Sequence, residues 1–317
     1  MIAATMPSEY HSSFRPDNPF PANIVKRADA ELDQLVSILQ REGVQVHRPK
    51  VVDWRKVGGY TAAMPRDGLM TVGHCVIEAP FAWGCRRQEI DLAYAEVLRE
   101  LEQDCSVRVI RAPKPPLPDT LYDNVSSNGD AVQGWVITNS RPAFDSADFM
   151  RFGKILLGQV SNVTNMKGIG YLQANIPEGY SVEILDVNDP HAMHIDATIL
   201  PLRDGLLVYN PEKVTETALR RHKVLEDWDL RPFPFTPEAH TQPPLFMTSP
   251  WLVMNVLVLD GRKVLVEEQD VEFSKWIERL GMVPIACPFR HVNSIGGSFH
   301  CATVDLVRKS FTKSERL

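Results

Sequence analysis

The chain has 317 residues, of which 44% are hydrophobic and 23% are charged, and its formal net charge is −6 at pH 7. These are the proportions of an ordinary globular protein that is long enough to bury a large core. The negative charge argues against a nucleic acid or an anionic membrane as partner, and no apolar run is long enough to cross a bilayer.

The number and spacing of the cysteines indicate a reducing compartment. There are five of them, an odd number without the spacing of a disulfide framework, and we interpret them as free thiols in a reducing environment. The N-terminus lacks the charged region and the long apolar core of a secretory signal. The sequence therefore predicts a cytoplasmic protein. It does not decide the oligomeric state, and a homodimer stays open.

The predicted elements follow one recurring order along the chain. A helix capped by Asn23 carries apolar residues on one face and ends at Gly43, and a strand is expected over 44–46. A strand pair, a helix and a closing strand then recur about four times. The pairs are expected at 68–72 with 75–78, within 148–160 with a break at Gly153, at 197–202 with 206–209, and at 253–259 with 263–267. The helices are expected at 88–102, 165–174, 214–225 and 271–280, and single strands at 107–110, 131–138, 181–185, near Pro232 and at 283–286.

This order predicts a ring of repeated units. A last strand over 302–307 has no helix after it, whereas the chain begins with a helix and a strand. If the termini meet, the first elements complete the last unit, and about five units form a propeller-like array. An open α/β sheet fits poorly, because every unit contains a hairpin. Without a Pro/Gly/Ser-rich linker we expect one α/β domain over 1–317, with about 20 residues at the N-terminus and about six at the C-terminus irregular.

Cys301 is the candidate nucleophile. It follows Gly296 and Gly297, whose backbones permit a tight bend. A lone intracellular cysteine is usually a small buried hydrophobe. However, His194 and Asp145 provide the two other groups that a thiol nucleophile needs, a proton shuttle and a carboxylate that orients it.

Two further readings concern histidines beside these residues. His191 and His194 could form a metal pair, but the segment leads into a strand-like alternation and no matching Cys or His set lies nearby, so we expect no metal. His300 precedes Cys301, and neighbours on a strand point to opposite faces. We therefore expect His300 to be structural.

A series of short motifs extends in order from residue 64 to the C-terminal region. They are Met64–Asp67, Glu78–Pro80, Ala112–Pro115, Phe144–Phe149, Met193–Thr198, Asn210–Glu212 and Gly296–Cys301. As an ordered set they resemble the arginine-dependent amidinotransferases, a family that includes the glycine and inosamine-phosphate amidinotransferases. The resemblance implies the fold of that family, the pentein propeller of five ββαβ units around a central channel.

The resemblance also implies a reaction. Cys301 would attack the guanidinium carbon of L-arginine, L-ornithine would leave, and the amidino group would pass from the cysteine to a primary amine, in specialised-metabolite biosynthesis. His194 would protonate the departing amine and then accept a proton from the incoming one, while Asp145 fixes the imidazole. No metal or organic cofactor is implied.

Other positions match substrate-binding residues of the family. Asp67 and Asp196 correspond to the carboxylates that hold the guanidinium. The remaining matches are Lys213, Met193, His191, Thr248 and Ser249. Lys213 replaces an arginine, which keeps the positive charge but loses the bidentate fork. His191 replaces an asparagine of the glycine-specific enzymes, so we expect an acceptor other than glycine.

Two alternatives remain. A guanidine-modifying hydrolase, such as a deiminase, would share the thiol, imidazole and carboxylate, but water would resolve its covalent intermediate. A catalytically silent binding protein would be expected to lack Cys301, His194 or Asp145, and all three are present.

Overall fold

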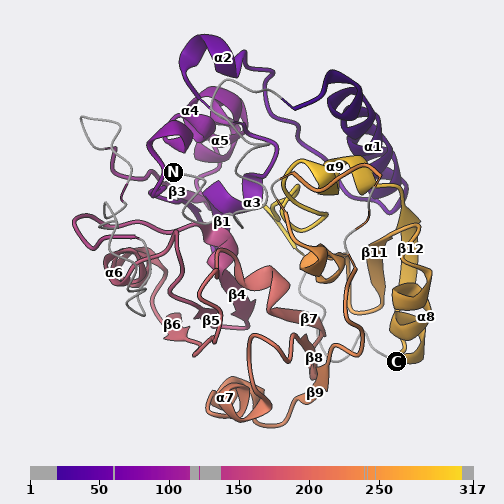
Figure 1. The fold of residues 1–317 in the computed structure, drawn as a ribbon. Coiled ribbons are helices and arrows are strands. Elements are labelled where there is room, and N and C mark those ends of the chain that lie inside the picture. The colour runs from indigo at the N-terminus through magenta and orange to yellow at the C-terminus, as the bar shows by residue number, and fades with distance from the viewer. Residues whose placement is uncertain are drawn as a thin grey trace, which may run out of the picture.

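The computed structural model describes residues 20–59, 61–114, 121, 137–238, 240, 242–246 and 248–308. Within these ranges the strands form four three-stranded sheets, arranged around one centre with helices outside them (Figure 1). No helix in the described part of the chain is both long enough and apolar enough to span a membrane.

Each sheet is built in the same way. Two strands form an antiparallel hairpin, and a third pairs in parallel with the second. The strands are β1 (Leu69–Val72), β2 (Cys75–Glu78) and β3 (Arg108–Ile110); β4 (Phe149–Phe152), β5 (Ile155–Gly158) and β6 (Ser181–Ile184); β7 (Ile199–Arg203), β8 (Leu206–Tyr209) and β9 (Asp229–Pro232); and β10 (Leu257–Val258), β11 (Lys263–Glu267) and β12 (Val283–Cys287). The predicted recurrence of hairpin, helix and strand is confirmed.

The connection from the second to the third strand of each sheet contains helix on the outer side (Figure 1). These helices are α4 (Glu89–Ala93) with α5 (Ala95–Glu102), α6 (Met166–Asn175), α7 (Glu216–Arg220) with η6 (Lys223–Leu225), and α8 (Val271–Arg279). The Asn165 side chain caps α6 by accepting a hydrogen bond from the Gly168 N–H, as an N-cap residue does.

The hydrophobic core lies between neighbouring units. Ile77 of β2 packs in one cluster with Leu156 of β5, and Leu157 of β5 packs in the next cluster with Leu207 of β8. A third cluster joins the third and fourth sheets. Because each unit buries its apolar faces against its neighbours, as repeat architectures do, the ring holds its inner loops at fixed positions.

The two ends of the described chain meet. Helix α1 (Ala22–Arg41) packs against α9 (Arg290–Ser294) and β12, as Figure 1 shows. The segment after Cys301 reaches the first unit, where the Thr71 hydroxyl donates to the carbonyl of Asp305 at 2.7 Å. The expectation that the two ends of the chain meet is therefore correct, whereas the completed unit is not seen as a sheet.

A fifth sheet is absent from the described residues, and the strands expected over 44–46 and 302–307 do not form. Residues Ala302 and Thr303 donate their N–H groups back to Ser298 and His300, in a turn. These donors are therefore not available for a strand ladder.

Several predicted boundaries are also wrong. Helix α1 begins at Ala22 after Pro21, without a side-chain cap from Asn23. The helix expected over 88–102 is interrupted at Tyr94, whose hydroxyl donates to the carbonyl of Ala62. The helix over 214–225 and the strand over 253–259 are shorter than expected, because 3₁₀ turns occupy part of each segment: η6, and η7 (Pro250–Met254). Most of the strand expected over 131–138 lies outside the described residues.

Glu31 joins the first helix to the segment that leads to Cys301. Its carboxylate accepts hydrogen bonds from the backbone N–H groups of His291 and Val292, at 2.9 and 3.0 Å, and from His291 Nδ1 at 2.6 Å. The Glu31 side chain is 10% exposed. The carboxylate thus satisfies N–H groups at the start of α9 that have no partner within the helix.

We expect Glu31→Ala to lower the free energy of unfolding by about 2–4 kcal/mol, because it leaves buried donors without an acceptor. Glu31→Gln keeps a neutral acceptor and should cost less. Asp29→Ala, at an exposed position of the same helix, is the matched control and should stay within about 0.5 kcal/mol of the parent protein. Urea unfolding measures all three, and equal stabilities for Glu31→Ala and Asp29→Ala would contradict this role.

Candidate active site

The polar residues at the centre come from equivalent places in the four units. Each first strand is preceded by a short helical segment, and these segments carry or flank Asp67, Asp145, Asp196 and Asn255. The segments are α3 (Pro65–Gly68), η4 (Ser146–Asp148), η5 (Ile195–Ala197) and η7. Since α3 contacts η4, η4 contacts η5, and η5 contacts η7, the repeated architecture brings side chains that are distant in sequence to one place.

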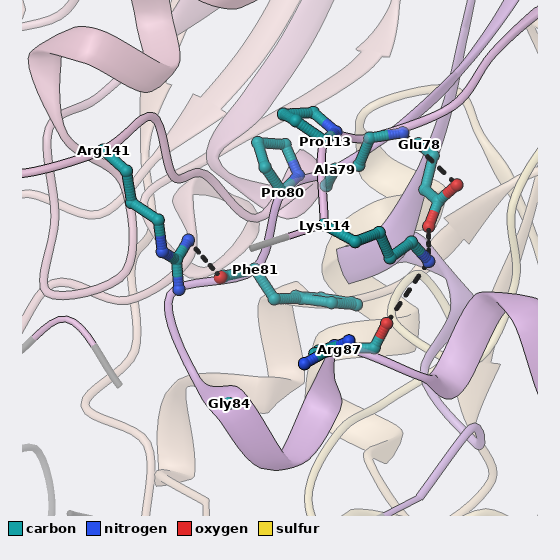
Figure 2. A pocket seen from close by; sticks show the side chains of 10 residues that line it. Glu78, Ala79, Pro80, Phe81, Gly84, Arg87, Pro113, Lys114 and Arg141 are labelled. Carbon is teal, nitrogen blue, oxygen red and sulfur yellow. Dashed lines mark hydrogen bonds and ion pairs between the residues drawn. The ribbon is translucent and has the colours of Figure 1, made fainter. Parts of the chain in front are cut away.

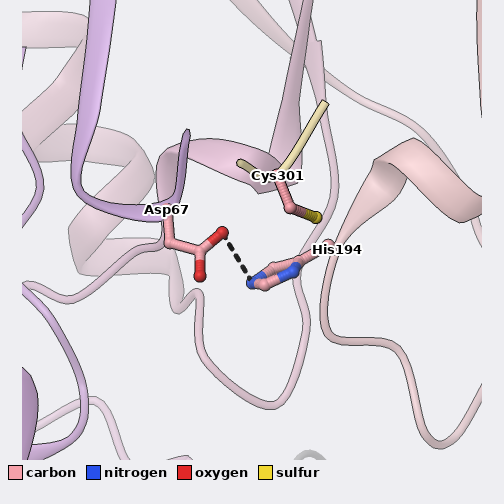
Figure 3. A group of neighbouring side chains, drawn as sticks. All are labelled: Asp67, His194 and Cys301. Carbon is pink, nitrogen blue, oxygen red and sulfur yellow. Dashed lines mark ion pairs between the residues drawn. The ribbon is translucent and has the colours of Figure 1, made fainter. Parts of the chain in front are cut away.

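Cys301, His194 and the carboxylates form one group. The Nε2 atom of His194 lies 3.1 Å from Asp145 Oδ2 and 3.7 Å from Asp67 Oδ1. A ring nitrogen of His194, a carboxylate oxygen of Asp67 and the sulfur of Cys301 all lie within 4.8 Å of one another (Figure 3). The structure therefore brings the predicted nucleophile, proton shuttle and orienting carboxylate together.

The backbone and the sulfur of Cys301 are held by Asn255. The Asn255 side chain accepts from the Cys301 N–H at 3.2 Å and donates to Sγ at 3.1 Å. The thiol donates in turn to Asp196 Oδ2 at 3.5 Å. Gly297 permits this approach, because a Cβ atom there would lie 2.5 Å from Met64 Sδ and 2.9 Å from Cys301 Cβ.

The environment of Cys301 favours the neutral thiol when the site is empty. Burial and the neighbouring Asp196 and Asp67 carboxylates raise the pKa of Cys301 to about 12, against the opposing effect of His194. A buried thiolate beside two carboxylates is unfavourable because like charges repel in a low dielectric. A cation bound to these carboxylates would remove that repulsion.

His194 carries a positive charge, opposite to the charge of the neighbouring carboxylates. Burial alone would lower the pKa of His194, but Asp67 and the hydrogen bond to Asp145 outweigh burial and raise that pKa well above its ordinary value. Asp67, His194 and Cys301 are also a set of donors that a metal could use. However, a protonated ring offers no lone pair to a metal, so the charges of the site favour a proton on His194. His191 is exposed and does not belong to this group.

Asp196 has a second partner in His300, whose Nδ1 lies 2.9 Å from Asp196 Oδ2. Burial and the nearby Arg66 guanidinium lower the pKa of His300, so the ring is neutral and Nδ1–H donates. Burial by itself would raise the pKa of Asp196, but the contact with His300, the nearby His194 and the hydrogen bond from the Cys301 thiol together outweigh it, and the pKa is lowered. Asp196 therefore stays ionised. The interpretation of His300 as a residue facing away from the site was wrong, because it rested on a strand that does not form.

The other predicted binding residues make contacts outside this group. Lys213 Nζ pairs with Asp189 Oδ2 at 2.9 Å, and Asp189 Oδ1 accepts from the His191 N–H at 2.9 Å. Met193 packs against the cluster that contains Trp83 and Val163. Thr248 and Ser249 precede η7, where the Ser249 hydroxyl accepts from the Trp251 N–H. Among the described residues, no hydrogen bond joins Thr248 or Ser249 to Cys301.

Three residues of the site were not among the sequence candidates: Asn255, His300 and Arg86. Arg86 Nη1 donates to Asp67 Oδ2 at 3.0 Å and to Asp145 Oδ2 at 3.2 Å. Asn255 and Asp196 occupy similar positions before a first strand, so alignment of the repeated units could have found Asn255. No comparable signal marks Arg86.

Comparison with known proteins gives a consistent result. The chain is 42% identical over 98% of its length to an L-arginine:L-lysine amidinotransferase of Pseudomonas savastanoi pv. phaseolicola, of which the match covers 87%. It is 37% identical over 93% of its length to the mitochondrial glycine amidinotransferase of Xenopus tropicalis, of which 72% is covered. No family model matches the sequence.

A solved structure is similar over nearly the whole chain. An amidinotransferase of the saxitoxin biosynthetic pathway from Microseira wollei superimposes with a TM-score of 0.83 at 36% identity, covering 92% of this chain and 86% of that one. The sequence and structural similarities therefore each extend over more than nine tenths of the chain.

Proposed function

The chain belongs to the amidinotransferase family of the pentein superfamily, and from this premise we propose that it transfers the amidino group of L-arginine to a primary amine and releases L-ornithine. The observation that carries the proposal is the cluster of a thiol, an imidazolium and three carboxylates, those of Asp67, Asp145 and Asp196, at one centre. A planar cation with several N–H donors suits this site, because the carboxylates of Asp67 and Asp196 both lie close to the Cys301 sulfur.

In this reaction Cys301 is the nucleophile. When the arginine guanidinium binds, its charge compensates Asp67 and Asp196, and the thiol can lose its proton to solvent while His194 stays protonated. The sulfur then bonds to the guanidinium carbon, and the bond from that carbon to the ornithine nitrogen breaks. His194 gives its proton to the departing amine and later takes one from the acceptor, whose nitrogen displaces the sulfur. Asp145 holds the His194 ring in place through both proton transfers.

The acceptor is a primary amine, and we propose that it is not glycine. His191 offers a bulkier group and a different hydrogen-bonding pattern than an amide would. L-Lysine is the first candidate, since the relative at 42% identity is named for it. Lys213 is proposed to bind the donor's carboxylate, for which it must share its charge with Asp189. Thr248, Ser249 and Met193 would line the same space.

We also propose that the segments at the two ends of the chain form a fifth, strand-poor unit of the ring. Support comes from the Arg66–Asp305 ion pair at 3.2 Å, the Thr71–Asp305 hydrogen bond and the packing of α1 on α9. A cytoplasmic location is likewise proposed, because all five cysteines are free.

The test of the function is product analysis. The protein is incubated with L-arginine and, in turn, L-lysine, glycine and an inosamine, and the products are identified by mass spectrometry. The proposal requires L-ornithine together with an amidinated amine, and we expect little product from glycine. Citrulline and ammonia without amine transfer would instead identify a hydrolase.

The ionisation of Cys301 gives a separate prediction. Because its pKa is raised, alkylation of Cys301 by iodoacetamide in the empty enzyme should still be accelerating above pH 9. Cys105, which is exposed, provides an internal reference for the concentration of active reagent in the same sample. Asp196→Asn removes a charge that raises the pKa of Cys301, so its alkylation at pH 8 should be faster. Peptide mass spectrometry separates the two thiols, and an alkylation rate of Cys301 that levels off below pH 9 would contradict the prediction.

A further inference from the structure

Two motifs have no part in the proposed mechanism: Glu78–Pro80 and Ala112–Pro115. Figure 2 shows Glu78 and Lys114 on the wall of a small cavity beside the first unit, where Lys114 Nζ pairs with Glu78 Oε1 at 2.6 Å. The same Nζ donates to the carbonyl oxygen of Arg87 at 3.3 Å. These contacts fix the backbone immediately after Arg86.

Arg86, at the end of η3 (Gly84–Arg86), is 6% exposed. Each of its three guanidinium nitrogens donates a hydrogen bond to a carboxylate. Its Nε and Nη2 atoms form a fork with the Glu89 carboxylate, at 3.0 Å from Oε1 and Oε2 respectively. Its guanidinium carbon lies 4.3 Å from the centre of the Phe81 ring. Phe81 lines the cavity of Figure 2, so the ring is held between this cavity and the guanidinium.

The third guanidinium nitrogen points into the active site. Nη1 donates to Oδ2 of both Asp67 and Asp145. Each of these two carboxylates also lies near His194 Nε2. Asp67 and Asp145 are 4% and 3% exposed. Two carboxylates so close together repel each other, and a shared cation is what allows both to be ionised.

On this basis we propose that Arg86 is a positioning residue of the amidino transfer, which holds Asp67 and Asp145 as a pair of ionised carboxylates at a fixed spacing around His194. The proposal rests on the proposed function. Arg86 would not touch the substrate. It would act through Asp67 on the binding of the donor's guanidinium and through Asp145 on the imidazolium.

Charge explains why a neutral residue could not replace Arg86. Arg86 and protonated His194 compensate two of the three negative charges on Asp67, Asp145 and Glu89. Without Arg86, three buried negative charges would face one imidazolium. Burial raises the pKa of Asp67 even with both cations present. It raises the pKa of Glu89 to about 7. Removing the guanidinium therefore favours a proton on one of the carboxylates at neutral pH.

Other titratable groups face the cluster from neighbouring segments. They are Cys85, Tyr94, His194, Asp196 and Cys301. Burial raises the pKa of both Cys85 and Tyr94, so these two stay neutral. The groups whose charge can respond to Arg86 near neutral pH are its own three carboxylate partners and His194.

The test compares Arg86→Met, Arg86→Lys and the control Arg87→Met, which changes the adjacent side chain. We measure the rate at which L-arginine forms the amidino adduct on Cys301 as a function of pH. In Arg86→Met, we expect the rate to fall by about 10²–10³-fold at pH 7 and to recover partly as pH rises, since the carboxylates then ionise. Arg86→Lys keeps the charge but cannot bridge three carboxylates, so it should restore part of the rate.

A second readout does not depend on turnover. With aspartate labelled with ¹³C at the side-chain carboxyl carbon, Arg86→Met should move the titration of Asp67 to higher pH, because Arg86 lowers the pKa of that carboxyl, whereas Arg87→Met should not. If Arg86→Met does not fold, the double variant Arg86→Met/Glu89→Gln, which leaves no unpaired carboxylate at Glu89, replaces it in both measurements.

The outcomes separate the two proposals. A rate reduced by the same factor at every pH, or an unchanged aspartate titration, would overturn the role of Arg86 even if the parent enzyme forms the adduct. A parent enzyme that forms no adduct from arginine would overturn the proposed function, while the aspartate titration would still decide the role of Arg86.

Discussion

Incubation of the protein with L-arginine in the absence of an acceptor should leave an amidino group on Cys301 and release one equivalent of L-ornithine. On our proposal Asp67 and Asp196 hold the cation. The sulfur lies within 4.8 Å of both Asp67 and His194, so the first half of the reaction needs no second substrate. Replacing Cys301 by alanine should abolish the adduct and lower the overall rate by about 10⁵–10⁶-fold.

The measurement is mass spectrometry of the intact protein and of its peptides. Cys105→Ala removes an exposed thiol elsewhere and serves as the matched control, with an unchanged yield of adduct. Steady-state kinetics should be ping-pong, since L-ornithine leaves before the acceptor enters. An adduct that persists in Cys301→Ala, or initial-rate lines that intersect, would show that another group attacks or that no covalent intermediate forms.

His194→Asn should be nearly as damaging as Cys301→Ala. The two residues act as one unit, so the double variant should be scarcely worse than either single variant. If the double variant lost activity by the product of the two single-variant factors, the two residues would have independent roles. The assay is the same measurement of adduct formation.

Much of the architecture could be predicted from local patterns. Period-two alternation at 69–72 and 75–78, with a turn at Gly73, specifies the first hairpin, and the residues of α6 and α8 show the helical period. Gly73 has φ of 57°, a conformation in which glycine is not strained. These features are short-range, and they repeat in each unit.

The errors arise where distant residues decide the local structure. Residues 302–307 have the composition of a strand, but hydrogen bonds to Ser298 and His300 and the contact of Asp305 with Arg66 hold them in another conformation. The helix over 88–102 is interrupted where Tyr94 reaches the backbone of Ala62. Tertiary contacts thus override propensity at these places.

The residues of the site also divide into those that local motifs predict and those that only distant contacts reveal. The short motifs pointed to Cys301, His194 and Asp145, and the structure brings these side chains together. Arg86 was missed because its importance lies in its partners, which are 3, 19 and 59 positions away in the chain. An arginine in an irregular segment looks like any surface arginine until the fold shows that it is buried. His300 was misjudged for a related reason, since its direction depends on a turn.

Asp145→Asn should leave the protein folded and lower the rate of adduct formation by about 10²–10⁴-fold. The carboxylate lies 3.1 Å from His194 Nε2 and contributes to the raised pKa of His194. Without its charge, the pKa of His194 falls, so the ring loses its proton at a lower pH. Because the protonated ring must supply a proton to the leaving amine, the basic limb of the rate profile should move to lower pH.

The matched control for Asp145→Asn is Asp148→Asn, three residues further along the same segment. Asp148 is fully buried, and its carboxylate accepts hydrogen bonds from Gln159, Ser161 and Thr164 rather than from His194. An amide there disturbs these bonds and should lower the thermal midpoint of unfolding without moving the basic limb. The comparison separates a residue that holds the imidazolium from one that holds the loop beneath it. If Asp145→Asn kept the parent's basic limb and Asp148→Asn shifted it, the carboxylate acting on His194 would be Asp148.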